Sequence, residues 1–148
     1  MTRTLASVAA ALVVALPCAA QAPIMVRGPT AILFVDPPPV FSGAPASPHE
    51  LADSSAAPLR KIAEREGFVF QVALVFVENP YRVLDTTGRI LYVAPRSLHT
   101  GLLLIAPGRE PQLIPHIPIP PELQQIIRDY RAGRVKLYNQ PATPTRAA

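Results

Sequence analysis

Hydrophobic residues are densest in one uninterrupted run, Phe68 to Val77 (FVFQVALVFV). Apolar residues occupy nearly all positions of both alternating sets, so both faces of an extended strand would be apolar. A strand with this pattern is normally covered on both sides, and we therefore predict a central strand of a sheet. We expect its aromatic face to pack against the helix that precedes it, and the arms of the chain or another protein to cover the second face.

Apolar residues at helical spacing precede this run and predict a helix over residues 58–66. Ser55 is the expected N-cap of this helix, and Gly67 is suited to end it. The stripe consists of Leu59, Ile62, Ala63 and Glu66.

Alternating residues downstream predict further strands. Tyr81 to Leu84 and Arg89 to Val93 flank a turn that ends in Gly88, which is typical of a hairpin. Another strand is expected over residues 98–106, where Gly101 indicates a bulge or a close approach of two backbones. The fold class predicted is α+β, with one helix followed by an antiparallel meander of about four strands.

A second amphipathic helix is predicted from Glu122 to Ala132, with Gly133 as its terminator. Val135 to Leu137 alternate with polar residues and suggest one short final strand, followed by a loose tail from 139 to 148. The apolar stripe of the helix consists of Leu123, Ile126, Ile127 and Tyr130.

Proline makes up 19 of the 148 residues and changes this picture, because it is excluded from central strands and helix interiors. We expect extended arms around a regular core. One strand-like run, Ala31 to Val35, lies in the first arm, while residues 37–53 have the composition of a loop. The expected units are a signal peptide over 1–22, a proline-rich arm over 23–57, the core over 58–106, a proline-rich linker over 107–121, the helix and short strand over 122–138, and the tail over 139–148.

The first 22 residues have the pattern of a secretory signal peptide. Arg3 precedes an apolar stretch from Leu5 to Leu16, and small residues permit cleavage after Ala20 or after Ala22. Cleavage would remove Cys18, the only cysteine, and would exclude disulfide and thiol chemistry in the mature chain. The predicted location is therefore the periplasm or the exterior of a bacterium, and a retained N-terminal helix is the alternative.

Charge is unevenly distributed, with five basic residues and one acidic residue between Leu123 and Ala148. An acidic protein or an anionic membrane surface would suit this end of the chain, whereas nucleic acid is an improbable partner for an exported protein. The overlapping Pro-x-x-Pro pattern nearby is typical of a stiff polyproline segment. The candidate interaction residues are Arg128, Arg131, Arg134, Pro115, Pro118 and Pro121.

Catalytic and metal-binding patterns are weak. The separations of His49, His99 and His116 match no common zinc spacing, and His99 is expected within an apolar strand. Ser97 and His99 would lie on one strand face, with Asp36 or Asp85 as a conceivable orienting acid. The scattered glycines form no phosphate-binding loop, so we expect no cofactor, and the spacing of the histidines leads us to expect no metal.

These observations favour a small exported, non-catalytic protein that docks onto an envelope partner or a second copy of itself. Docking would use Ala31 to Val35 as an added edge strand, the proline segment, or the helix from Glu122 to Ala132. Two alternatives stay open. One is a ligand-binding or hydrolytic periplasmic protein with a pocket near His99, and the other is a subunit of a membrane assembly.

Overall fold

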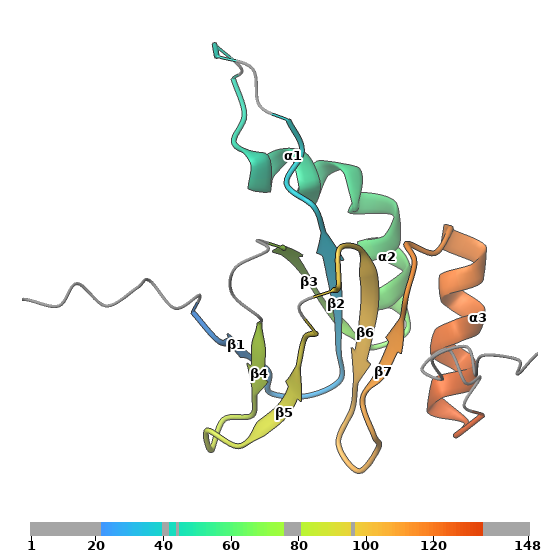
Figure 1. Cartoon of the computed structure of the whole chain (residues 1–148). Helices are drawn as coiled ribbons and strands as arrows, with labels where there is room; N and C mark the ends of the chain where they lie inside the picture. The colour runs from blue at the N-terminus through green and yellow to red at the C-terminus, as the bar shows by residue number, and fades with distance from the viewer. Residues whose placement is uncertain (1–21, 40–41, 44, 76–80, 96, 135–148) are drawn as a thin grey trace, which may run out of the picture.

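The computed structural model describes residues 22–39, 42–43, 45–75, 81–95 and 97–134. Within these residues the chain forms three layers: helices, a four-stranded sheet and a smaller three-stranded sheet (Figure 1). The predicted α+β class is confirmed. The arrangement of the strands differs from the predicted meander.

The middle layer is a sheet with the strand order β3-β2-β6-β7. Strand β2 pairs in parallel with β3 and antiparallel with β6, and β6 pairs antiparallel with β7. The strands are β2 (Thr30–Val35), β3 (Val69–Leu74), β6 (Gly101–Ile105) and β7 (Gln112–Ile114).

Strands β2 and β6 occupy the two central positions of this sheet, so the predictions for two of the runs are wrong. The run from Ala31 to Val35 lies inside the sheet, with Ala31, Ile32 and Phe34 fully buried, so it offers no edge to a partner. The run that begins at Phe68 forms an edge strand, β3, whose Val69 is 58% exposed. Both runs are apolar on both faces, and the pattern therefore could not decide which of them has two neighbours.

The second sheet has the order β1-β4-β5 and packs over the face of the middle sheet that lies opposite the helices. The expected hairpin is confirmed, because β4 and β5 are antiparallel and Gly88 has a φ of 85° in the turn. The meander is wrong, since this hairpin pairs with the N-terminal arm instead of with β3 or β6. The strands are β1 (Ile24–Met25), β4 (Arg82–Leu84) and β5 (Ile90–Val93).

Three helices cover the other face of the middle sheet: α1 (Pro48–Ser55), α2 (Ala57–Arg65) and α3 (Pro120–Arg131). Helices α2 and α3 match the predicted ones. Helix α1 occupies part of the segment expected to be a loop, and it makes Ser55 its last residue, so the N-cap of α2 is Ala56.

The start of α1 explains why a helix forms in this proline-rich segment. The hydroxyl of Ser47 accepts a hydrogen bond from the Glu50 N–H, and the Glu50 carboxylate accepts one from the Ser47 N–H. This capping box satisfies two backbone donors, and Pro48 occupies a first-turn position where no N–H is needed.

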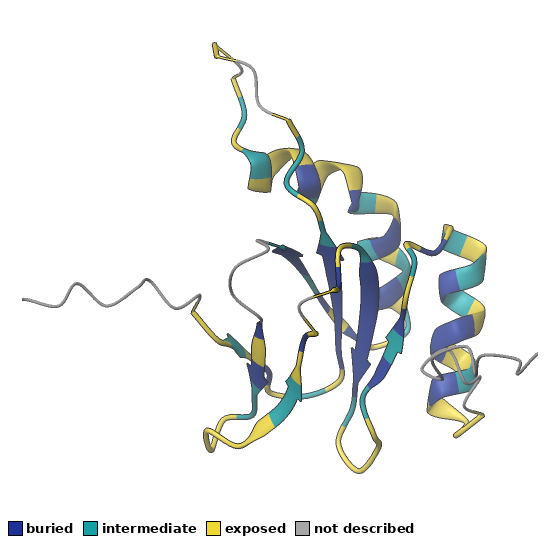
Figure 2. Cartoon of the chain, viewed as in Figure 1, coloured by how far each residue is buried: buried dark blue, intermediate teal, exposed yellow. Residues whose placement is uncertain are grey.

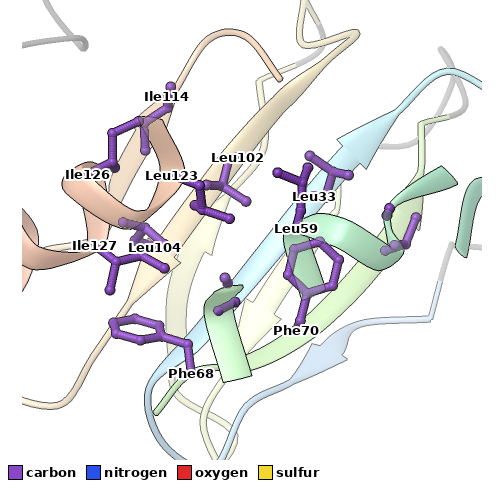
Figure 3. Close-up of a cluster of buried hydrophobic side chains, with 14 of the residues drawn as sticks. Leu33, Leu59, Phe68, Phe70, Leu102, Leu104, Ile114, Leu123, Ile126 and Ile127 are labelled. Atoms are coloured by element: carbon purple, nitrogen blue, oxygen red, sulfur yellow. The ribbon is translucent and has the colours of Figure 1, made fainter. Parts of the chain in front are cut away.

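The helix-side core is built from alternate residues of the strands (Figure 3). The predicted packing of the aromatic face on the preceding helix is confirmed, because Phe70 shares this core with α2 and its ring lies 5.5 Å from the guanidinium of Arg60. The C-terminal helix contacts the same face. Tyr130 of α3 meets Phe68 edge to face, with ring centroids 6.3 Å apart. Figure 3 labels Leu33, Leu59, Phe68, Phe70, Leu102, Leu104, Ile114, Leu123, Ile126 and Ile127 from this core.

The opposite face of the middle sheet forms a second core with the small sheet. Ile32 and Phe34 of β2 face it, together with Leu103 of β6, and all three are fully buried (Figure 2). The Phe34 ring lies 5.8 Å from that of Tyr81, measured between centroids. The N-terminal arm contributes Val26 to this core, so it is part of the folded unit.

Gly101 begins β6 at a point where two backbones meet. A Cβ at this position would lie 2.8 Å from the carbonyl oxygen of Ile114 and 3.3 Å from Cδ1 of Leu98. The close approach suggested by the sequence is confirmed.

Several predictions fall outside the described residues. These are the signal peptide up to residue 21, the short strand from Val135 to Leu137 and the tail. No helix in the described part of the chain is long and apolar enough to cross a membrane. The linker expected over 107–121 contains β7 and the first residues of α3.

Candidate interaction surface

The arginines predicted as an interaction site on α3 contact an acid of the same chain. Nη2 of Arg128 lies 3.4 Å from Oε1 of Glu66, and Nη1 of Arg131 lies 3.5 Å from Oε2 of the same carboxylate. The Gln124 amide also donates to Glu66, at 3.3 Å. The Glu66 side chain is only 12% exposed, so α3 covers it and the arginines neutralise it.

The third predicted arginine lies just beyond the end of α3. Arg134 lies 3.3 Å from Asp129, measured between Nε and Oδ1. Arg128, Arg131 and Arg134 keep between 56% and 71% of their side chains exposed. Their charges are partly offset within the chain, and the apolar stripe of α3 is buried in the core. Helix α3 therefore has no free apolar face for a partner.

The predicted proline residues differ in exposure. Pro115 and Pro121 are exposed, whereas Pro118 is buried. Pro121 lies in the first turn of α3, and the N–H of Ile119 donates to Glu122 at 3.4 Å. A partner could therefore reach only one side of this segment.

His99 is not within a strand, which corrects the prediction for it. It precedes β6, its side chain is 61% exposed, and its Nδ1 lies 3.4 Å from Oδ1 of Asp36. Ser97 is also exposed and outside the strand, and in the described part of the chain no hydrogen bond joins it to His99. Of the Ser97, His99 and Asp36 trio, the structure brings together only the His99–Asp36 pair.

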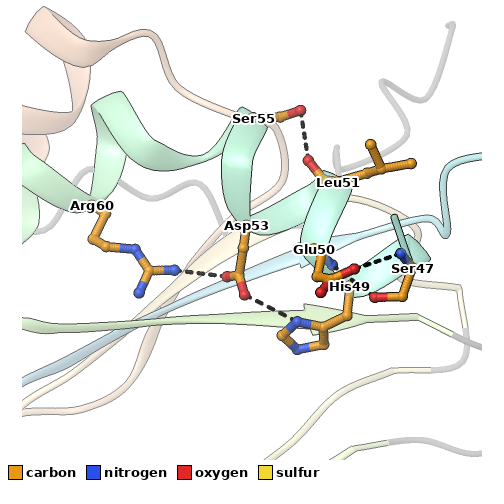
Figure 4. Close-up of polar contacts among 7 residues, drawn as sticks. All are labelled: Ser47, His49, Glu50, Leu51, Asp53, Ser55 and Arg60. Atoms are coloured by element: carbon orange, nitrogen blue, oxygen red, sulfur yellow. Dashed lines mark hydrogen bonds and ion pairs between the residues drawn. The ribbon is translucent and has the colours of Figure 1, made fainter. Parts of the chain in front are cut away.

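The other two histidines have acidic neighbours on the surface. His49 lies on α1, where its Nδ1 is 3.0 Å from Asp53, one helical turn away, so the expected loop position is wrong (Figure 4). Asp53 also accepts from Arg60 at 2.7 Å. His116 contacts Glu122 at 2.8 Å. Among the described residues no three His, Cys, Asp or Glu side chains come together in a way that would hold a metal ion.

An apolar groove lies between α1 and the end of β2, close to the His99–Asp36 pair. Its volume is about 260 Å³, and Asp36 and Ser55 are the polar residues at its rim. Apolar side chains form the remaining walls, among them Leu33, Val35, Leu51, Leu59 and Ile117.

Exposed apolar side chains gather on the outer face of the small sheet, which the sequence pattern did not predict. We use "outer face" for Met25, Leu84, Ile90, Val93 and Arg82. Met25 and Ile90 both pair with Leu84 in the strand register, and Val93 pairs with Arg82. Met25, Ile90 and Val93 are 47%, 53% and 48% exposed.

A shift in strand register creates this apolar face. Val83 points into the second core with its register partners Ile24 and Tyr92, but the register slips between Val83 and Leu84. Ile90 is consequently placed opposite Leu84 on the outer side. The alternation of apolar and polar residues along the hairpin gives no sign of this irregularity.

Comparisons with known proteins return no relationship: no family model, no curated protein and no solved structure matches the chain.

Proposed function

We propose that the protein is a small exported, non-catalytic accessory protein that docks onto a protein partner in the bacterial envelope. Export rests on the apolar stretch from Leu5 to Leu16 and the small residues that follow it. Docking rests on one observation, the outer face, where three large apolar side chains are each about half exposed on one small sheet. Apolar side chains gathered in this way are typical of an interaction surface.

Charge favours a different protein over a second copy of this chain. The described residues of the small sheet and its turns contain Arg27, Arg82 and Arg89 but only one acid, Asp85. Two copies packed face to face would bring like charges together, which opposes association. A partner with an apolar patch and acidic residues around it would complement the outer face.

The test is co-purification of the tagged protein from its own host, followed by mass spectrometry of the intact chains. We expect a stoichiometric envelope protein with the wild type and its loss with Ile90→Asp or Val93→Asp. Val69→Asp is the matched control, because Val69 is equally exposed but lies on β3. Equal capture by all variants, or a monomeric protein with no companion, would refute docking through the outer face.

The same mass measurement tests export. A chain that begins at Gln21 or Pro23 would establish removal of the signal peptide. An intact N-terminus would contradict cleavage and would favour the alternative of a subunit held in a membrane assembly.

A second candidate function follows from the apolar groove beside Asp36 and His99. An apolar cavity with a few polar groups at its rim is the usual form of a site for a small molecule. Under this alternative the protein binds an apolar ligand, and the exposed His99–Asp36 pair contacts the polar end of that ligand. A saturable increase in the fluorescence of an environment-sensitive apolar dye, lost in Leu51→Asp and kept in Val69→Asp, would support it.

A further inference from the structure

Three turns that are far apart in the sequence meet at one end of the two sheets. They are the bend after β1, the turn between β4 and β5, and the turn between β6 and β7 (Figure 1). Together they enclose an open groove of about 560 Å³. This volume lies within the range of known ligand sites, roughly 300–1,000 Å³.

Arginine is the characteristic side chain of this groove, since each turn contributes one: Arg27, Arg89 and Arg109. Arg109 is already engaged, because its Nη2 donates to the backbone carbonyl of Arg131 at the end of α3. Arg27 and Arg89 are exposed and form no ion pair with any described residue. Two guanidinium groups on the walls are therefore available to a ligand.

Neither acid of the groove forms an ion pair with these arginines, although Asp85 is close enough to Arg89 for their opposite charges to attract and partly offset each other. Asp85 accepts hydrogen bonds from the Thr87 hydroxyl and N–H and from the Arg89 N–H, at 2.6, 2.8 and 3.0 Å. Its carboxylate is thus directed into its own hairpin turn. Glu110 is exposed, and its backbone carbonyl accepts from Tyr130 at 3.0 Å.

We propose that this groove binds an oxyanion, a carboxylate or phosphate group, with Arg27 and Arg89 as the charged donors. Guanidinium groups form charge-assisted, frequently bidentate hydrogen bonds with such groups. Arg109 is a positioning residue that joins the turn between β6 and β7 to α3. Glu110 opposes the anion by like charge. The site is separate from docking through the outer face, with which it shares only Ile90.

The experiment is a titration of the purified full chain with inorganic phosphate, citrate and a hexaglutamate peptide. Amide chemical shifts report binding, and sodium chloride keeps the ionic strength constant. We expect saturable shifts in residues 26–28, 85–91 and 105–111. Binding of phosphate or citrate would identify a free small anion, and binding of hexaglutamate alone would identify an acidic protein segment. Shifts no larger than those with chloride alone would overturn the proposal.

Substitutions separate this site from general surface charge. Arg27→Gln and Arg89→Gln should each weaken binding roughly three- to tenfold, the range for an accessible charge-assisted contact. Glu110→Gln should tighten it, because repulsion is removed. Arg82→Gln and Arg65→Gln are controls, being exposed arginines outside the groove. If these controls weaken binding as much as Arg27→Gln does, the site is wrong. Val93→Asp changes the outer face at a residue outside the groove and should bind the anion normally, so failure of docking and failure of this site are distinguishable.

Discussion

Arg131 contacts Glu66 at two points: its Nη1 lies 3.5 Å from the carboxylate and 3.1 Å from the backbone carbonyl of the same residue. The contact joins the C-terminal helix α3 to the residue that caps α2. Because cations stabilise the carbonyl end of a helix, Arg131 acts on both the side chain of Glu66 and the end of α2. The pair thus links two helices that are about half the chain apart in sequence.

Glu66→Gln should lower the free energy of unfolding by about 1 kcal/mol. The substitution keeps the shape of the side chain but removes the charge that Arg128 and Arg131 share. Because both arginines are more than half exposed, water screens the ion pairs, and we expect the loss of stability to be no larger than the upper limit for surface pairs. Urea denaturation measures it, with Glu64→Gln as the control on the exposed side of α2. Equal losses in the two variants would show that Glu66 is an ordinary surface acid.

Gly101→Ala should destabilise the protein by about 2 kcal/mol, because the added Cβ would approach the Ile114 carbonyl to 2.8 Å. Thermal denaturation of the purified variants measures the effect. Gly28→Ala is the matched control, since nothing lies within 4 Å of a Cβ there. A Gly101→Ala protein as stable as the wild type would contradict this, because it would mean that β6 and β7 can move apart to fit the Cβ without loss of stability.

Ser47→Ala should lower stability by about 1 kcal/mol, the usual value of an N-cap hydroxyl. The Ser47 hydroxyl lies 3.2 Å from the backbone nitrogen of Glu50 and accepts a hydrogen bond from it. Chemical denaturation tests this, with Ser54→Ala as the control on the exposed side of the same helix. If Ser54→Ala is the more damaging change, the capping assignment is wrong.

Acid should remove the contribution of Glu50 to the same cap. The hydrogen bond from the Ser47 N–H holds the pKa of Glu50 below its ordinary value of 4.5. The folded state binds the proton less readily than the unfolded state, so this stabilisation is present above the unfolded pKa and is lost as the pH falls through the folded pKa. The stability difference between wild type and Glu50→Gln should therefore shrink below pH 4.5. A difference independent of pH would contradict this role of the carboxylate.

Alkaline solution should weaken the contact of α3 with the sheet. Burial raises the pKa of Tyr130 above its ordinary value of 10.0. The neutral phenol is favoured in the folded state, so its contribution is complete below the unfolded pKa and is lost as the pH rises through the folded pKa. The melting temperature of the wild type should fall more steeply above pH 10 than that of Tyr130→Phe. Burial also raises the pKa of Tyr92, which would add its own loss of stability at high pH. Both proteins in the comparison should therefore carry Tyr92→Phe.

The periodicity of apolar residues was sufficient to predict α2, α3 and the hairpin, because each of them buries one side and exposes the other. The same periodicity could not predict the order of the strands in the sheet. Ala31 to Val35 and Phe68 to Val77 have the same local character, and only pairing with β6 makes the shorter run central. Helix α1 was missed although Ser47 and Glu50 form a recognisable capping box, because the prolines around it indicated a loop.

The candidate surfaces depend on contacts that no local pattern contains. The arginines of α3 were predicted to be available, yet Glu66, which offsets two of them, lies on α2 and was assigned to an apolar stripe. The outer face depends on a register slip at Leu84, and the arginine groove depends on three separate turns. Such features appear only when strand pairing is known.

The central position of β2 has a consequence for the order in which the protein folds. Its neighbour β3 follows after two helices, whereas β6, its other neighbour, lies about twice as far along the chain. Local contacts form before distant ones because closing a longer loop costs more entropy. A chain emerging N-terminus first would therefore display the unpaired edge of β2 until residues 101–105 arrive, and an open, apolar strand edge invites aggregation. The newly made protein should thus depend on a chaperone most strongly in the interval before β6 is available.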